Sequence, residues 1–228
     1  MTVNSPRIAA FLVAAVCLAT CIGVVPLSAQ TVVVSAPSGP PSSDAVAQAR
    51  ADSIRHPYTD ADIHFMSSMI GHHAQAIVMA RWAPSHGASP SVQTLAARII
   101  NAQQDEIGTM QRWLGDRLQP VPDAVATGMR MQMNGMEHEM LMPGMLTDAQ
   151  MKELDAARGP EFDRLFLKDM IQHHTGALTM VKQLFDSYGA GQDETVFKFA
   201  TDVNVDQTTE IARMQKLLVA VTLGADSP

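Results

Sequence analysis

Two pairs of adjacent histidines are the residues in this sequence with the clearest potential for chemistry. His72-His73 lies in Met-Ile-Gly-His-His-Ala-Gln-Ala-Ile-Val-Met, and His173-His174 lies 101 residues later in Met-Ile-Gln-His-His-Thr-Gly-Ala-Leu-Thr-Met. The methionines that bound the two copies are Met69 and Met79 in the first and Met170 and Met180 in the second. Neutral imidazole and thioether both donate to soft or borderline cations such as copper. The repeated pattern therefore indicates a metal site.

Helical periodicity places these donors on one side of a helix. At about 100° per residue, the inward positions of the first copy fall within roughly 120° of arc, the width of a core-facing stripe. These positions are Phe65, Met69, His72, His73, Ala76, Met79 and Ala80. The alternative is a duplicated helical hairpin whose histidines are only hydrogen-bonded core residues. We favour ligation, because four buried rings would each have to satisfy both nitrogens.

Methionine is concentrated a second time between the two copies. The chain contains 16 methionines, and residues 129–145 read Met-Arg-Met-Gln-Met-Asn-Gly-Met-Glu-His-Glu-Met-Leu-Met-Pro-Gly-Met. Alternation interrupted by Gly and Pro does not suit a helix that packs on a core. Thioethers on a flexible or extended segment can wrap Cu(I) or Ag(I), and the alternative is an adaptable surface that grips a protein partner. The candidate ligands here are Met129, Met131, Met133, Met136, His138 and Met140.

Capping and breaking residues predict four long helices around these motifs. Thr59 and Asp62 resemble a capping box, and Ser89 followed by Pro90 marks a second helix start. The expected helices begin at about residues 59, 89, 160 and 193 and run to about residues 82, 114, 188 and 221, with a short helix from Thr147 to the break at residues 159–160. The apolar side of the fourth helix is expected to include Phe197, Phe199, Val203, Gln207, Ile211, Met214 and Leu218.

The duplication extends to the helix that follows each histidine pair. Gln103-x-x-Glu106-Ile107-x-x-Met110 matches Gln207-x-x-Glu210-Ile211-x-x-Met214. Glu106, Met110, Glu210 and Met214 are therefore candidates to orient a histidine or to bind directly, although a solvated carboxylate explains each glutamate equally well. Two hairpins and one long crossover predict an all-α, ferritin-like four-helix bundle. We expect repeat one at 59–117, the Met-rich crossover at 118–146 and repeat two at 147–222.

Residues 1–29 have the charge, apolar run and small-residue exit of a secretory signal peptide. A competing interpretation is a lipobox that ends at Cys21 and makes the protein a lipoprotein. An uncleaved anchor is disfavoured by the short apolar run. Both cysteines lie in this segment, so an exported form has no disulfide and no thiolate ligand. We expect a disordered linker at 30–57, the bundle at 58–224, and a periplasmic or secreted location.

Charge and missing motifs argue against several functions and leave a ferritin-like di-metal oxidoreductase as the less favoured alternative. The net charge of −7 and the lack of a Lys/Arg-rich run argue against a nucleic-acid partner. A ferritin-like di-metal oxidoreductase would need Glu-x-x-His motifs, and a nucleophilic hydrolase typically shows Gly-x-Ser-x-Gly; neither occurs. We therefore expect a protein that is not an enzyme. A metal-free interaction module that uses the Met-rich segment is the main alternative to metal binding.

The pattern Met-Ile-x-His-His-x-x-Ala-x-x-Met followed by Glu-Ile-x-x-Met occurs twice. It resembles the bacterial family known as domain of unknown function 305, which includes CopM-like periplasmic copper-binding proteins, from about Thr59 to Leu218. The resemblance implies an exported ferritin-like bundle that binds copper, Cu(I) especially, through His and Met and contributes to copper tolerance. Ligation by the Met-rich crossover is our own inference.

We therefore expect an exported protein that sequesters or carries Cu(I), with Ag(I) or Cu(II) as further cations. A delivery partner among copper-handling envelope proteins and assembly into a homo-oligomer both stay open.

Overall fold

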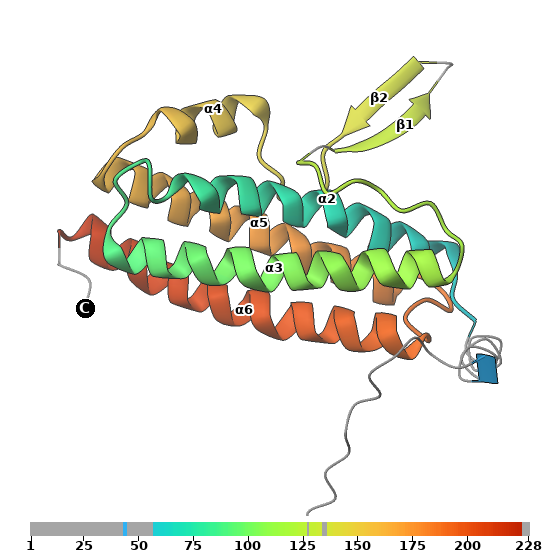
Figure 1. Ribbon diagram of the computed structural model, residues 1–228. Helices are drawn as coiled ribbons and strands as arrows, with labels where there is room; N and C mark the ends of the chain where they lie inside the picture. Colours follow the sequence, from blue (N-terminus) through green and yellow to red (C-terminus); the bar gives the residue numbers. More distant parts are fainter. Residues whose placement is uncertain (1–42, 45–56, 127, 134–135, 225–228) are drawn as a thin grey trace, which may run out of the picture. The chain divides into compact units, whose positions relative to one another are not determined.

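The computed structural model describes residues 43–44, 57–126, 128–133 and 136–224. Four long helices form two hairpins, α2 (Asp60–Trp82) with α3 (Pro90–Asp116) and α5 (Pro160–Asp186) with α6 (Glu194–Thr222). Figure 1 shows the two hairpins side by side, with α2 against α5. The predicted all-α four-helix bundle is confirmed. The predicted signal peptide, the lipobox cysteine Cys21 and nearly all of the linker lie outside the described residues.

Local capping explains where the helices begin. The Thr59 hydroxyl accepts a hydrogen bond from the Asp62 backbone N–H at 3.3 Å, and Asp62 Oδ2 accepts one from the Thr59 N–H at 2.7 Å. This reciprocal pair satisfies two backbone donors at the start of α2. Ser89 caps α3 with Pro90 in the first turn, and Thr147 forms a second capping box at the short helix α4 (Asp148–Ala156). The caps read from the sequence are therefore the ones that the structure uses.

The core consists of two apolar clusters, one toward each end of the bundle. One contains Phe65, Leu114 and Phe199, and the other contains Val92 and Phe162. Along α5 the histidine pair falls between the stretches that belong to the two clusters, and along α2 the same holds except for Ile77, which follows the pair but belongs to the cluster of Phe65. The bundle therefore has two apolar ends separated by a polar level, and each hairpin contributes to both ends.

The crossover between the hairpins contains a two-stranded ribbon that the sequence did not predict as strands. Strand β1 (Met129–Met133) pairs antiparallel with β2 (Met136–Met140). The register joins Met129 to Met140, Met131 to His138 and Met133 to Met136. Alternate residues of a strand share a face, and directly paired residues share it too. These six positions therefore occupy one face of the ribbon.

Burial departs from the expected pattern in two places. Helix α2 is buried beyond its predicted stripe, at Met66, Ser68 and Gln75 for example, because the end of the crossover and α4 cover a further side of it. The assignment of Phe197 to the apolar side of α6 was wrong. Its side chain is 55% exposed and packs at the surface against Phe185, with ring centroids 5.9 Å apart.

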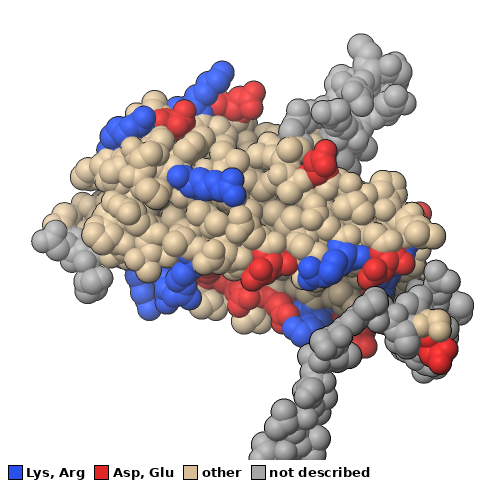
Figure 2. Space-filling model, viewed as in Figure 1, with Lys and Arg blue, Asp and Glu red and all other residues tan. Residues whose placement is uncertain are grey.

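The surface carries dispersed charge. Figure 2 shows Lys and Arg separated from one another and interleaved with Asp and Glu on the face in view. Nucleic-acid binding depends on clustered positive charge, and this face does not offer it. Within the described part of the chain, no helix is long and apolar enough to cross a bilayer.

Candidate metal centre

A polar layer crosses the bundle between the two apolar clusters. All four histidine side chains of the repeated motif are buried in it, with 0% exposure. Each following helix adds a buried glutamine and a partly exposed glutamate one turn later. We call this set the polar layer; it contains His72, His73, Gln103, Glu106, His173, His174, Gln207 and Glu210. The sequence prediction that the histidines face inward is thus met by all four rings.

His72 and His173 meet at the centre of this layer. Their ring centroids are 3.8 Å apart and the planes are inclined at 38°. His72 Nε2 donates to the carbonyl oxygen of Pro143 at 3.0 Å, and His173 Nε2 donates to the carbonyl oxygen of His72 at 3.0 Å. Because a carbonyl only accepts, Nε2 must carry the hydrogen, so Nδ1 of each neutral ring holds a free lone pair. Neither Nδ1 has a hydrogen-bond partner in the described part of the chain.

Burial keeps these two central rings uncharged. Desolvation, followed by the proximity of His73, lowers the pKa of His72 to about 3, and the Pro143 carbonyl opposes this only in part. Desolvation also holds the pKa of His173 well below its ordinary value, with His72 as the next cause. A metal competes with the proton for the same lone pair. The two Nδ1 atoms are therefore available as ligands at neutral pH.

The outer histidines lie against carboxylates. His174 Nε2 hydrogen-bonds Glu210 Oε2 at 2.7 Å, and His73 Nε2 lies 2.8 Å from Glu106 Oε2 without the alignment of a hydrogen bond. Metal-binding histidines commonly use one nitrogen in this way, on a carboxylate or a carbonyl, and ligate with the other. The Nδ1 atoms of His73 and His174 are also without partners among the described residues. All four rings therefore have an unpartnered Nδ1, and three of them also have a hydrogen-bonded Nε2.

The glutamines of the layer are left unsatisfied as well. Both amide atoms of Gln103 and the Gln207 oxygen are buried without a hydrogen bond in the described part of the chain. Each such group costs roughly 1–3 kcal/mol, and native proteins leave few of them unless water or an ion completes the contacts. A concentration of these atoms at one level of the bundle marks the place where a ligand is expected.

The methionines of the motif are divided between the two apolar clusters on either side of the polar layer. Met69, Met110 and Met180 belong to one apolar cluster, while Met79, Met170 and Met214 belong to the other. Each cluster thus takes two thioethers from one repeat and one from the other. Met140, at the end of β2, is 49% exposed. The side chains of Met129, Met131, Met133, Met136 and His138 lie outside what the structure describes, so their role as ligands stays a prediction.

Nitrogen and oxygen donors alone do not complete a metal site. Among the described residues, no three His, Cys, Asp or Glu side chains converge closely enough to hold an ion. The soft or borderline donors at and beside the polar layer are its imidazoles and the thioether sulfurs of the two adjoining clusters. This mixture suits Cu(I) or Ag(I) better than Mg²⁺ or Ca²⁺, which prefer oxygen.

The end of the crossover covers His72, which the sequence analysis did not predict. Gln75 donates to the Leu146 carbonyl at 3.0 Å and accepts from its N–H at 2.7 Å, and Gln172 donates to the Gly144 carbonyl at 3.3 Å. An added Cβ at Gly176 would lie 1.9 Å from the Pro143 oxygen. We call residues 143–146 the strap. The sequence carries a related signal, because the two motif copies exchange Gly and Gln: they read Gly-His-His-Ala-Gln and Gln-His-His-Thr-Gly. Three of these exchanged residues, Gln75, Gln172 and Gly176, contact the strap.

Comparison with known proteins identifies the family. Residues 62–218 match the family described as Domain of unknown function (DUF305). This chain belongs to the DUF305 family. The resemblance inferred from the repeated motif is thereby confirmed, and the matched residues contain both histidine pairs together with the crossover between them.

Solved structures of DUF305 proteins share the fold. A fragment from Deinococcus radiodurans is 26% identical, covers 71% of this chain and 97% of its own, and superposes with a TM-score of 0.59. A Streptomyces coelicolor member described as secreted is 29% identical, with 74% and 95% coverage and a TM-score of 0.58. CopM in its Cu(II)-bound form is 30% identical, with 69% and 95% coverage and a TM-score of 0.53.

A shorter match joins the chain to an uncharacterized protein of Acanthamoeba polyphaga mimivirus. The two are 38% identical over 56 residues, which is 25% of this chain and 37% of that relative. The match thus spans little more than a third of the viral protein.

Proposed function

We propose that this protein binds Cu(I) in the polar layer and sequesters or carries it in the bacterial envelope, with Ag(I) or Cu(II) as further cations. The observation that carries the proposal is the pair of buried, neutral rings of His72 and His173, whose Nδ1 lone pairs have no partner among the described residues. Imidazole nitrogen with thioether sulfur nearby is a donor set that suits copper.

Two comparisons support the choice of cation and location. CopM has been crystallised with Cu(I), Cu(II) and silver, and the Cu(I)-bound form superposes on this chain with a TM-score of 0.50 at 27% identity. The Streptomyces coelicolor relative is described as secreted. Both agree with the signal peptide predicted from the first 29 residues and with an envelope protein that handles copper.

We propose binding, not catalysis, as the role of the site. The four imidazoles are fully buried and the strap covers His72, so a substrate larger than an ion could not reach them without displacing backbone. The carboxylates that contact the layer, Glu106 and Glu210, each approach a histidine, unlike the Glu-x-x-His arrangement of di-metal oxidoreductases. Oxidase or peroxidase turnover by the copper-loaded protein would contradict this part of the proposal.

His86 offers a matched control for testing the central histidines. It is also buried, at 5% exposure, yet Nε2 contacts Asp155 at 2.9 and 3.0 Å and Nδ1 contacts the Ser85 hydroxyl at 2.9 Å. His86 thus shows a histidine with both nitrogens satisfied by the protein, as expected for a structural role.

The experiment is an anaerobic Cu(I) titration against a chromophoric chelator. We expect His72→Gln and His173→Gln to weaken Cu(I) binding by about tenfold or more, since each removes a ligand, whereas His86→Gln should leave the affinity unchanged. Glutamine keeps a donor for the carbonyl that each Nε2 contacts. Wild-type affinity in both central variants would overturn the polar layer as the Cu(I) site, and a wild-type chain that binds no Cu(I) would favour the metal-free interaction module.

A further inference from the structure

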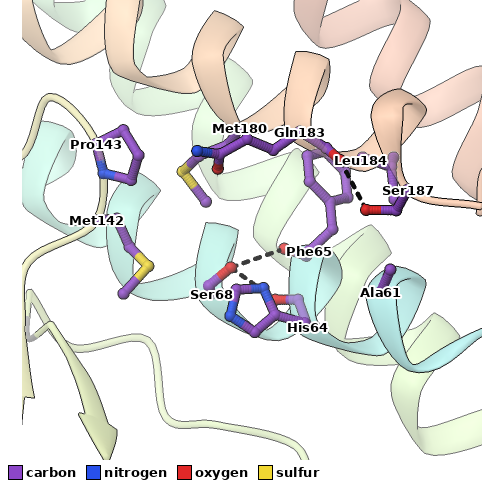
Figure 3. Close-up of a pocket in the computed structure, with 10 residues that line it drawn as sticks. All are labelled: Ala61, His64, Phe65, Ser68, Met142, Pro143, Met180, Gln183, Leu184 and Ser187. Atoms are coloured by element: carbon purple, nitrogen blue, oxygen red, sulfur yellow. Dashed lines mark hydrogen bonds between the residues drawn. The ribbon is translucent and has the colours of Figure 1, made fainter.

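A cavity of about 300 Å³ opens between α2 and α5, beside the point where the crossover returns to the bundle. Figure 3 shows His64 and Phe65 on the α2 side, Met180 and Leu184 on the α5 side, and Met142 from the crossover at its edge. Pro143, whose carbonyl accepts the His72 hydrogen bond, lines the same cavity. The cavity therefore adjoins the polar layer but contains none of its histidines.

Three soft or borderline donors border this cavity, the His64 ring and the sulfurs of Met142 and Met180. The His64 side chain is exposed, and only its backbone carbonyl is engaged, as acceptor from the Ser68 hydroxyl at 2.6 Å. Within the described part of the chain, no hydrogen bond or ion pair involves the His64 ring or the sulfurs of Met142 and Met180. In Figure 3 the ring and both thioethers border the same space. They come from three separate segments, which the fold alone brings together.

The equivalent place in the other half of the bundle is built differently. Leu165 stands 101 residues after His64 and is buried in the cluster that also contains Leu154 of α4 and Met79. Apolar side chains occupy the space between α2 and α5 around Leu165, and α4 packs over both helices there. The duplicated scaffold can thus close this position with leucine. In the first repeat it instead leaves an opening that carries an imidazole.

We propose that His64, Met142 and Met180 form a second, outer site for a monovalent soft cation, Cu(I) or Ag(I). One imidazole and two thioethers suit such a cation, and no Asp, Glu, Lys or Arg lines the cavity, so a hard divalent ion would find no carboxylate ligand there. Met side chains are flexible enough to close around an ion within this volume. The site is separate from the polar layer and rests on the proposed function only for the identity of the cation.

The test is an Ag(I) titration of the full chain followed by NMR of methionine methyl groups and histidine rings. We expect the Met142 and Met180 methyl signals and the His64 ring signals to shift together. His64→Leu introduces the residue that the second repeat has at the equivalent position, Leu165, and His64 is exposed. This variant should bind one equivalent of Ag(I) fewer than the wild type. Met142→Leu should do the same, while Met66→Leu, at a buried position of α2 outside the cavity, should bind as the wild type does.

The outcomes separate this site from the polar layer. Loss of one equivalent in His64→Leu, with His72 and His173 ring signals still responding to Ag(I), supports the outer site. The outer site is overturned if His64→Leu and Met142→Leu bind as many Ag(I) ions as the wild type and the methyl signals of Met142 and Met180 do not shift in the wild type. This outcome leaves the proposed function intact. Response at the outer residues without any response at His72 and His173 would support the outer site and contradict the polar layer.

Discussion

The neutral ring of His72 links the stability of the metal-free protein to pH. A histidine in the unfolded chain titrates near 6.5, while burial lowers the pKa of folded His72 to about 3. Between these values the unfolded state binds more protons than the folded state, so the free energy of unfolding falls as the pH falls. The contribution is fully present above about 6.5. His173 acts in the same direction because its pKa is also lowered.

We expect urea denaturation of the metal-free protein to show a smaller loss of stability between pH 7 and pH 4.5 in His72→Gln than in the wild type. Glutamine does not titrate and retains a donor for the Pro143 carbonyl. His86→Gln, at a histidine whose two nitrogens are bonded by the protein, provides the comparison. Equal losses in the wild type and in His72→Gln would contradict a buried, neutral His72.

A single glycine determines whether the strap can close over α5. A Cβ on Gly176 would lie 1.9 Å from the Pro143 oxygen and 2.5 Å from the Gly144 Cα, both backbone atoms that cannot move aside alone. Gly176→Ala should therefore destabilise the protein by roughly 1–3 kcal/mol or more. At Gly108, also in a helix, the nearest atom is a flexible Arg112 nitrogen at 3.2 Å, so Gly108→Ala should be neutral or stabilising. Equal midpoints in chemical denaturation would contradict this.

At the scale of elements, an aspartate of each repeat accepts a backbone hydrogen bond from the interhelical loop of the other repeat. Asp62 at the start of α2 accepts the Gly191 N–H at 2.7 Å in the α5–α6 loop. Asp163 at the start of α5 accepts the Ser89 N–H at 3.1 and 3.2 Å, where the α2–α3 loop ends. This exchange explains why the repeat contains an aspartate ahead of each histidine pair. It serves the fold and not the metal.

Removing one of these aspartates should cost stability without changing the metal site. We expect Asp62→Ala to lower the free energy of unfolding by roughly 1–3 kcal/mol, because the buried N–H of Gly191 and the partly buried N–H of Thr59 lose their acceptor. Asp60→Ala, at an exposed position in the same turn, should cost less than about 1 kcal/mol. Thermal or urea unfolding measures both. A larger effect at Asp60 than at Asp62 would refute the role assigned to the cross-repeat contact.

The sequence predicted those elements that depend on local chemistry. Thr59, Ser89 and Thr147 announce helix starts because their partners are only a few residues away. The strap could not be predicted in this way, since Gln75 and Leu146 are 71 residues apart and meet only after the bundle forms. His64 was missed because an exposed histidine looks unremarkable until the fold brings Met142 and Met180 beside it.

At the scale of the whole molecule, the two repeats are similar in the core and differ at the surface. Each apolar cluster draws methionines from both repeats, and all four imidazoles have an Nδ1 without a partner among the described residues, while Nε2 is hydrogen-bonded in His72, His173 and His174. The motif alone predicted that these residues face inward. It could not predict which nitrogen is free, because that depends on the Pro143 carbonyl and on backbone contacts between repeats. Helix α4 breaks the symmetry, since it packs against α2 and α5 and has no counterpart ahead of α2 among the described residues.

The ribbon of the crossover concentrates methionine positions in two paired strands. Its register puts Met129, Met131, Met133, Met136, His138 and Met140 on one face, and it pairs Arg130 with Glu139 and Gln132 with Glu137 on the other. Methionines at these positions would offer several thioethers to Cu(I) at once, and Met142 follows the ribbon closely in the sequence. The protein would then hold copper at the ribbon, at the cavity and in the polar layer.

Replacing the four methionines at positions 129, 131, 133 and 136 by leucine should distinguish Cu(I) binding at the ribbon from Cu(I) binding in the core. Leucine is similar in volume, so far-UV circular dichroism and the melting temperature should stay as in the wild type, while the number of Cu(I) ions bound per chain falls. Arg130→Gln with Glu139→Gln alters a pair on the opposite face and should leave that number unchanged. If the leucine variant binds as many ions as the wild type, the ribbon is not a copper site, and its methionines are better explained as a surface for a protein partner.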